Sequence, residues 1–160
     1  MPKPRIYVDT TIPSAYHTRR TDPGSVERRA TTRRWWQSAV RTSELLISDA
    51  VLQELSDGIS DQVVLRLSLV EGLEVLPATD DIARTEAVYM QQKLMPQDPE
   101  GDALHLALAS HHRCDALVTW NYHHLANPNK LDRIRRLNEE LGLFVPRICT
   151  PKALLEGHHE

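Results

Sequence analysis

The sequence has two cysteines, no long hydrophobic run and little net charge, and each shortage excludes a class of protein. Cys114 and Cys149 stand alone without a C-x-x-C pair, which excludes a disulfide-stapled secreted domain and predicts a reducing compartment. No apolar run approaches the roughly 20 residues of a membrane helix, and residues 1–16 lack a signal-peptide layout. We therefore expect a soluble, cytoplasmic protein that does not enter the membrane.

The net charge of -3 and the pI near 6.2 exclude a uniformly basic nucleic-acid-binding protein, so any contact with RNA must be local. Basic residues are concentrated in the segment 17–41, which contains seven arginines and only two acidic residues. These are Arg19, Arg20, Arg28, Arg29, Arg33, Arg34 and Arg41. A contact with nucleic-acid phosphates, a protein-binding surface and a solvated helix face all remain open for this segment.

A length of 160 residues with 41% hydrophobic residues fits one domain, and no internal repeat, low-complexity tract or linker divides the chain. We expect a folded domain over residues 1–155 and a frayed tail over 156–160. Short apolar runs, each the size of a buried strand, alternate with segments of helical spacing. The runs are Ile6–Val8, Leu45–Ile47, Leu73–Leu76, Ala116–Val118 and Leu143–Val145. This alternation predicts an α/β fold with a mostly parallel central sheet flanked by helices.

Helix boundaries are marked by capping residues and glycines. Thr79 is expected to cap a helix, and Ser48 or Asp49 another, which Gly58 separates from the next helix. Residues 95–101 are expected to form a loop, and a last long helix should run from near Asn129 to Gly142. Two sets of residues are expected on apolar helix faces: Ile82, Ala83, Ala87, Met90 and Leu94; and Trp35, Trp36, Ala39 and Val40. The helix after Gly58 is expected to contain Val63, Val64, Leu67 and Val70.

Three acids and one amide fall where a parallel sheet forms its ligand crevice, beyond the carboxyl ends of the strands. Asp9 directly follows the first strand, and Glu54 lies one turn into the helix after the second. Asp102 opens a helix that is apolar on nearly every side, and Asn121 follows the fourth strand. Asp115 precedes that strand and is a poor candidate because it lies at the opposite end.

Taken singly, each of the three acids also has a structural interpretation. Asp9 and Asp102 fit helix-capping positions, and Glu54 fits a solvated helix flank. Thr10, Thr11 and Thr119 fit the same capping role, with metal-water or phosphate binding as the alternative.

The stretches YVDTTIPS, ISDAVLQEL, EGDALHLALA and DALVTWNYHHL, taken together, resemble the successive acidic motifs of the PIN-domain family, in that family's order and spacing. The resemblance covers nearly the whole chain, from Ile6 to about Leu155. It implies a metal-dependent ribonuclease with Asp9, Glu54 and Asp102 as the acidic triad. Many members of the family have a fourth acid where this chain has Asn121. Similarity to the toxins of bacterial toxin-antitoxin pairs further implies a homodimer and a cognate antitoxin protein.

The residue types suit the chemistry that the resemblance implies. Mg²⁺ and Mn²⁺ prefer oxygen ligands, from a few carboxylates plus waters and substrate phosphate. Asp9, Glu54 and Asp102 are therefore expected to hold the metal, with Asn121 at the same catalytic site. Zinc is disfavoured, because none of the eight histidines has the spacing of a structural site with Cys114, and His105 fits a hydrogen-bonded core histidine.

Two other enzyme classes are disfavoured. An aspartyl-phosphate phosphatase needs a second acid two residues after the first, where this chain has Thr11. A receiver domain needs a phosphoacceptor after the middle strand, where this chain has Pro77 and Ala78. The non-enzymatic alternative is a catalytically degenerate PIN module that only binds RNA or protein, and the neutral Asn121 favours it.

Overall fold

A computed structural model describes residues 2–58, 60–94, 101–121 and 128–157. Its centre is a five-stranded sheet, in which all neighbouring strands run parallel in the order β3-β2-β1-β4-β5. The strands are β1 (Arg5–Val8), β2 (Glu44–Ser48), β3 (Glu74–Leu76), β4 (Ala116–Val118) and β5 (Arg147–Cys149). The predicted α/β class is confirmed, and the sheet of the described chain is wholly parallel.

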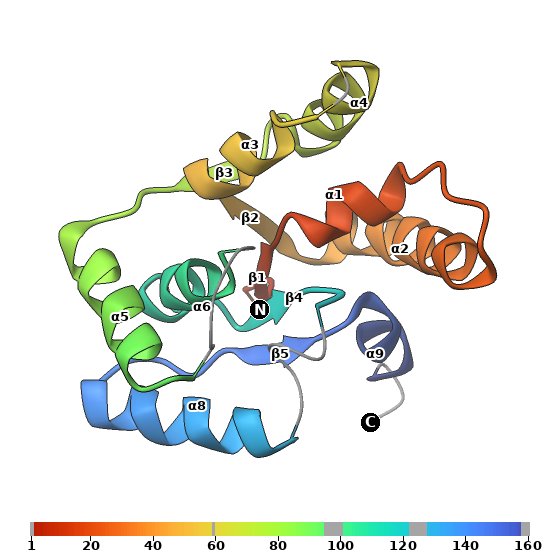
Figure 1. Cartoon of the computed structure of the whole chain (residues 1–160). Helices are drawn as coiled ribbons and strands as arrows, with labels where there is room; N and C mark the ends of the chain where they lie inside the picture. The colour runs from red at the N-terminus through yellow and green to blue at the C-terminus, as the bar shows by residue number, and fades with distance from the viewer. Residues whose placement is uncertain (1, 59, 95–100, 122–127, 158–160) are drawn as a thin grey trace.

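Helices cover both faces of this sheet (Figure 1). Helices α1 and α9 pack against α2 on one side, and α5 packs against α6 on the other (Figure 1). The described helices are α1 (Thr11–Tyr16), α2 (Pro23–Thr42), α3 (Asp49–Leu55), α4 (Ser60–Val70), α5 (Asp80–Gln91), α6 (Asp102–His111), α8 (Pro128–Leu141) and α9 (Pro151–Glu156). In the described part of the chain, no helix combines the length and apolar character that crossing a membrane requires.

The core consists of strand residues covered on both faces, as expected for a parallel sheet. Tyr7, Val8, Leu46 and Leu117 have no exposed surface. Helix α6 contributes a second buried layer, because all its residues from Ala103 to Ser110 are buried except Leu104, which is partly buried. The prediction that this helix is buried is confirmed.

The predicted helix boundaries are largely confirmed. The hydroxyl of Thr79 accepts a hydrogen bond from the Ile82 amide, and the hydroxyl of Ser48 accepts one from the Val51 amide. Gly58, at a φ of +119°, lies between α3 and α4. The expected loop 95–101 lies outside the described residues, except for Gly101. Residues 158–160 of the expected tail also lie outside them.

The fifth strand is not where the sequence predicted it. Leu143–Val145 is irregular, and β5 begins at Arg147. The Leu143 amide and the Phe144 carbonyl are bonded to Asn138 of α8, which completes the turn after Gly142. Pro146 then follows without an N–H to donate to a ladder. This apolar run therefore ends a helix instead of joining the sheet.

The predicted buried face of α5 is also partly wrong. Ala83, Ala87 and Met90 are exposed, and the buried face consists of Ile82, Thr85 and Tyr89. The two polar residues tolerate burial because each finds a partner: Thr85 bonds His111, and Tyr89 donates to Asn138. One residue assigned to the apolar face of α2 is likewise exposed, Val40, whereas Trp35, Trp36 and Ala39 are buried as predicted.

The strand order reverses direction at β1, which lies between β2 and β4. Ligands of open parallel sheets bind where this reversal separates the loops beyond the strand ends. Asp9 at the end of β1 and Thr119 at the end of β4 are adjacent there, because the Asp9 amide donates to the Val118 carbonyl. The topology thus places the crevice where the sequence predicted the site.

Candidate active site

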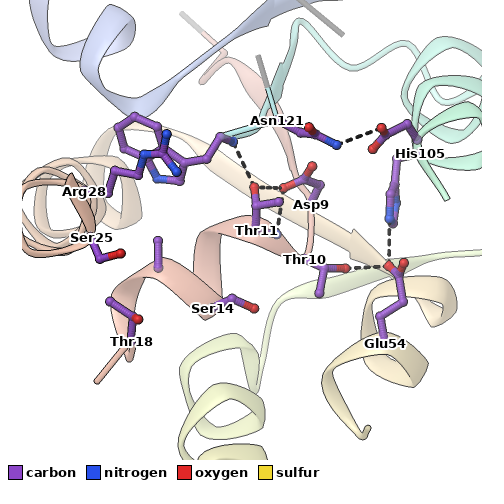
Figure 2. A pocket seen from close by; sticks show the side chains of 13 residues that line it. Asp9, Thr10, Thr11, Ser14, Thr18, Ser25, Arg28, Glu54, His105 and Asn121 are labelled. Atoms are coloured by element: carbon purple, nitrogen blue, oxygen red, sulfur yellow. Dashed lines mark hydrogen bonds and ion pairs between the residues drawn. The ribbon is translucent and has the colours of Figure 1, made fainter. Parts of the chain in front are cut away.

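A cavity of about 540 Å³ opens at this edge of the sheet (Figure 2). All four predicted site residues, Asp9, Glu54, Asp102 and Asn121, line it. The other lining residues are Thr10, Thr11, Ser14, Ala15, Thr18, Ser25, Arg28, His105 and Trp120. Residues separated by more than 100 positions in the chain therefore meet in one space.

Asp9 is nearly inaccessible, with 2% of its surface exposed. Its Oδ1 accepts hydrogen bonds from the amide of Thr11 at 3.0 Å and from the hydroxyl of Thr11 at 2.5 Å. Asp9 is not the N-cap of α1, because that position is Thr10; Asp9 bonds the Thr11 amide from the residue before the cap. Burial raises the pKa of Asp9 above its ordinary value, although His105 and the hydrogen bonds from Thr11 and Thr119 act in the opposite direction. Burial therefore outweighs the stabilisation that His105 and these hydrogen bonds give to the carboxylate.

Asp102 is also buried, at 3% exposure, in the first turn of α6. Its Oδ2 accepts a hydrogen bond of 2.8 Å from the side-chain amide of Asn121 (Figure 2). The Asn121 backbone is fixed in turn, because its amide donates to the hydroxyl of Thr119 at 3.0 Å. The structure thus places the predicted fourth residue beside Asp102.

Glu54 is held by two groups, and the exposed fraction of its side chain is 31%. Thr10 donates to Glu54 Oε1 at 2.5 Å, and His105 Nε2 lies 2.8 Å from the same oxygen. Gly101, at a φ of +72°, allows α6 to start close to this carboxylate, since a Cβ there would lie 3.2 Å from Glu54 Oε2. Glu54 therefore belongs to a hydrogen-bonded network and is not the freely solvated flank residue that its spacing also allowed.

His105 connects Glu54 to the interior of the sheet. Its Nδ1 lies 2.7 Å from the hydroxyl of Tyr7, which lies 2.7 Å from the hydroxyl of Ser48. Burial alone would lower the pKa of His105, but the hydrogen bond to Glu54 and the surrounding carboxylates outweigh it and raise that pKa. Burial likewise opposes ionisation of Glu54, yet His105 and Thr10 lower its pKa. The pair is thereby favoured in its charged form.

No curated protein matches the chain closely enough to serve as a relative. The family model described as the PIN domain matches residues 6–127, which is more than half of the chain and includes all four predicted site residues. The chain belongs to the PIN-domain family. PIN domains are generally nucleases, and PIN nucleases generally use divalent metals. The predicted family is confirmed, and the toxin branch stays a prediction.

The residues of this PIN domain fit a divalent cation of the Mg²⁺ type. Asp9 and Asp102 offer buried oxygen donors in one cavity, and the raised pKa of Asp9 indicates that a nearby positive charge would stabilise it. Among the described residues, no three acid, histidine or cysteine side chains converge into a complete metal cluster. Two carboxylates are sufficient for Mg²⁺, which usually keeps several waters and binds substrate phosphate.

Sequence reasoning missed several residues of this PIN domain's cavity, among them His105, Arg28 and Trp120. His105 was assigned to the core, which its 1% exposure confirms, but it also lines the cavity beside Glu54. The sequence signal for this role was its spacing, since residues three apart, such as Asp102 and His105, lie on the same face of a helix. Arg28 was one of seven arginines, and nothing in the sequence distinguished it from the others. Trp120 stands in the stretch DALVTWNYHHL but was not singled out.

Proposed function

We propose that this PIN domain is a Mg²⁺- or Mn²⁺-dependent endoribonuclease that hydrolyses RNA phosphodiester bonds. The main observation in support is that Asp9 and Asp102, two carboxylates almost fully removed from water, line the same open cavity. Burying a carboxylate costs free energy that hydrogen bonds and neighbouring charges must offset, and such costs are concentrated at functional sites.

Each residue of the site has a distinct proposed role. Asp9 and Asp102 would hold the cation, which when bound would supply water activation and stabilisation of negative charge at the phosphate. Thr11 orients Asp9, and Asn121 orients Asp102, through the hydrogen bonds that these pairs make. Glu54 completes the acidic set, with its direction fixed by Thr10 and His105.

The biological setting is proposed from the resemblance to toxin ribonucleases. On this proposal the chain is the toxin of a type II toxin-antitoxin pair, acts in the cytoplasm, forms a homodimer and is inhibited by a cognate antitoxin protein. The exposed arginines of α2 that lie outside the cavity, such as Arg34, supply charge for an acidic antitoxin segment.

The test is cleavage of a panel of transfer, ribosomal and messenger RNAs by the pure protein, with Mn²⁺ and with excess chelator. We expect cleavage only with the metal. Asp9→Asn and Asp102→Asn are expected to reduce the rate by at least about 100-fold, since each removes a charge at the metal while preserving side-chain shape. Asp57→Asn is the matched control, because Asp57 is an exposed acid outside the cavity.

Two outcomes would contradict this proposal. Undiminished cleavage in chelator would exclude the metal mechanism. Absence of cleavage of every RNA, with binding retained, would instead favour the catalytically degenerate PIN module.

A further inference from the structure

The cavity has a second wall whose chemistry differs from that of its acids. We define the Arg28–Trp120 wall as Arg28 and Trp120 together with the hydroxyl residues Ser14, Thr18 and Ser25, all of which line the cavity. Figure 2 shows Arg28, Ser25 and Thr18 on the side away from Glu54 and His105. The wall offers one cation, one aromatic face and several neutral donors, and it has no carboxylate.

Hydrogen bonds from both its side chain and its backbone hold Trp120 in a fixed orientation. Its indole N–H donates to the hydroxyl of Thr32 at 2.8 Å, and Thr32 donates to the carbonyl of Arg28 at 2.6 Å. Its backbone amide donates to the hydroxyl of Thr11 at 2.9 Å, the same hydroxyl that bonds Asp9. The ring is thus positioned relative both to α2 and to the proposed metal ligand.

Arg28 differs from the neighbouring arginines in its contacts. Arg19 pairs with Asp61, Arg20 pairs with Asp22, and Arg29 and Arg33 donate to backbone carbonyls. The Arg28 guanidinium lies 5.6 Å from the centroid of the Trp120 ring, and within the described part of the chain no acid or carbonyl accepts from it. Its side chain is exposed, so its N–H donors are available to an anion.

We infer that the Arg28–Trp120 wall is a subsite for one unpaired nucleotide next to the scissile phosphate, an inference that rests on the proposed nuclease function. The base stacks on the Arg28–Trp120 pair, its phosphate accepts from Arg28, and the hydroxyls of Ser14, Thr18 and Ser25 bond the sugar and phosphate. Aromatic rings and arginine planes are the usual stacking surfaces for unpaired bases.

The size and polarity of the space agree with this ligand. A volume of about 540 Å³ lies in the range of small-molecule pockets, which suits one nucleotide. Bases inside a duplex already stack on each other and cannot reach such a wall. The substrate is therefore a single-stranded region, and a fully paired RNA of the same length is excluded from this subsite.

Intrinsic fluorescence tests the subsite without requiring cleavage. Trp35 and Trp36 are 4% and 7% exposed, whereas Trp120 is only partly buried and lines the cavity. We expect an oligouridylate RNA of about eight nucleotides to quench the tryptophan fluorescence of the metal-free protein in chelator. The quenching should be lost in Trp120→Phe, which keeps an aromatic ring and most of the affinity.

Binding by the same oligouridylate, measured by anisotropy at several salt concentrations, separates the two parts of the wall. Trp120→Leu should weaken binding about tenfold, with an unchanged salt dependence, because stacking is lost and no phosphate contact is removed. Arg28→Gln should reduce the slope of log affinity against log salt by about one phosphate contact. Arg34→Gln is the matched control, since Arg34 is an exposed arginine of the same helix outside the cavity, and it should change the slope less.

Equal affinity of Trp120→Leu and the parent would overturn the inference. So would equal binding of a duplex, or identical salt slopes for the Arg28 and Arg34 variants. Because binding is measured without metal, loss of these effects with cleavage intact contradicts the subsite alone. Loss of metal-dependent cleavage with the effects intact contradicts the nuclease proposal alone.

Discussion

The two ends of the sheet treat charged residues in opposite ways. At the amino end, Arg5 pairs with Glu44 at 3.1 Å, with side-chain exposures of 33% and 42%, and the Arg5 amide donates to exposed Asp115. At the carboxyl end, Asp9 and Asp102 are almost completely buried, Thr11 and Asn121 donate hydrogen bonds to them, and the charge of His105 acts on both.

We interpret this difference as a structural use of charge at the amino end and the proposed functional use at the carboxyl end. Exposed pairs contribute little to stability, so the acids of the amino end are replaceable at small cost. Buried acids lower stability unless something compensates their charge, and such groups are concentrated at functional sites. Asp115, which the sequence placed at the wrong end for catalysis, indeed lies at the amino end, bonded to Arg5.

The largest stability effect should come from His105 at the carboxyl end. Replacing His105 with Phe leaves Glu54 without its cation and Tyr7 without one of its partners, so we expect a loss of about 2 kcal/mol in unfolding free energy. Chemical denaturation in chelator measures it. His112→Phe is the control just beyond the other end of α6, where the half-buried ring bonds the Pro77 carbonyl, and it should cost less than about 1 kcal/mol.

The effect of His105 should depend on pH. The pKa of His105 is raised in the folded protein. Its contribution to the free energy of unfolding is therefore complete below the ordinary histidine pKa of about 6.5, and it declines as pH rises through the raised pKa. The stability difference between the parent and His105→Phe should therefore be larger at pH 6 than at pH 9, measured in chelator. A difference that grows with pH would contradict the charged state assigned to the His105–Glu54 pair.

Asn121→Asp should have an intermediate effect, which destabilises the metal-free protein and stabilises the metal-bound protein. It replaces the donor to Asp102 with a like charge, so the metal-free protein should lose about 1 kcal/mol. The added carboxylate should raise Mn²⁺ affinity, as measured by calorimetry. Asn129→Asp, at an exposed position of α8, is the control for added charge. Unchanged Mn²⁺ affinity and an unchanged cleavage rate would place Asn121 outside the metal environment.

The smallest effect is expected at the amino end. Glu44→Gln breaks the exposed pair with Arg5 and should change the unfolding free energy by less than about 1 kcal/mol, with no change in RNA cleavage. Denaturation and a cleavage assay on the same preparation check both. A loss of cleavage would show that the two ends of the sheet are functionally coupled, contrary to this comparison.

The sequence was sufficient to predict the fold where burial alone selects the residues. Strands β1, β2 and β4 are apolar because helices cover both faces, and the strand-end rule then located Asp9 and Asn121 at the crevice. The same reasoning failed where polar residues satisfy each other across elements. Tyr89 and Asn138, 49 positions apart, bond in the interior, and no local pattern of apolar residues reveals such a pair.

The candidate site was predictable in its acids but not in its supporting contacts. The acids stand in recognisable motifs, whereas the role of His105 depends on Glu54, which lies 51 positions earlier in the chain. Arg28 likewise became distinct from the other arginines only through its placement over Trp120. Contacts of this kind are set by tertiary packing, so helix or strand spacing does not encode them.

Calorimetric titration of the metal-free protein with Mn²⁺ tests the central claim most directly, because it measures the cation at Asp9 and Asp102 without requiring the right RNA. We expect saturable binding in the parent and in Asp57→Asn, and its loss in Asp9→Asn and Asp102→Asn variants that remain folded. The same affinity and heat in all four proteins would show that these two buried carboxylates do not hold the metal.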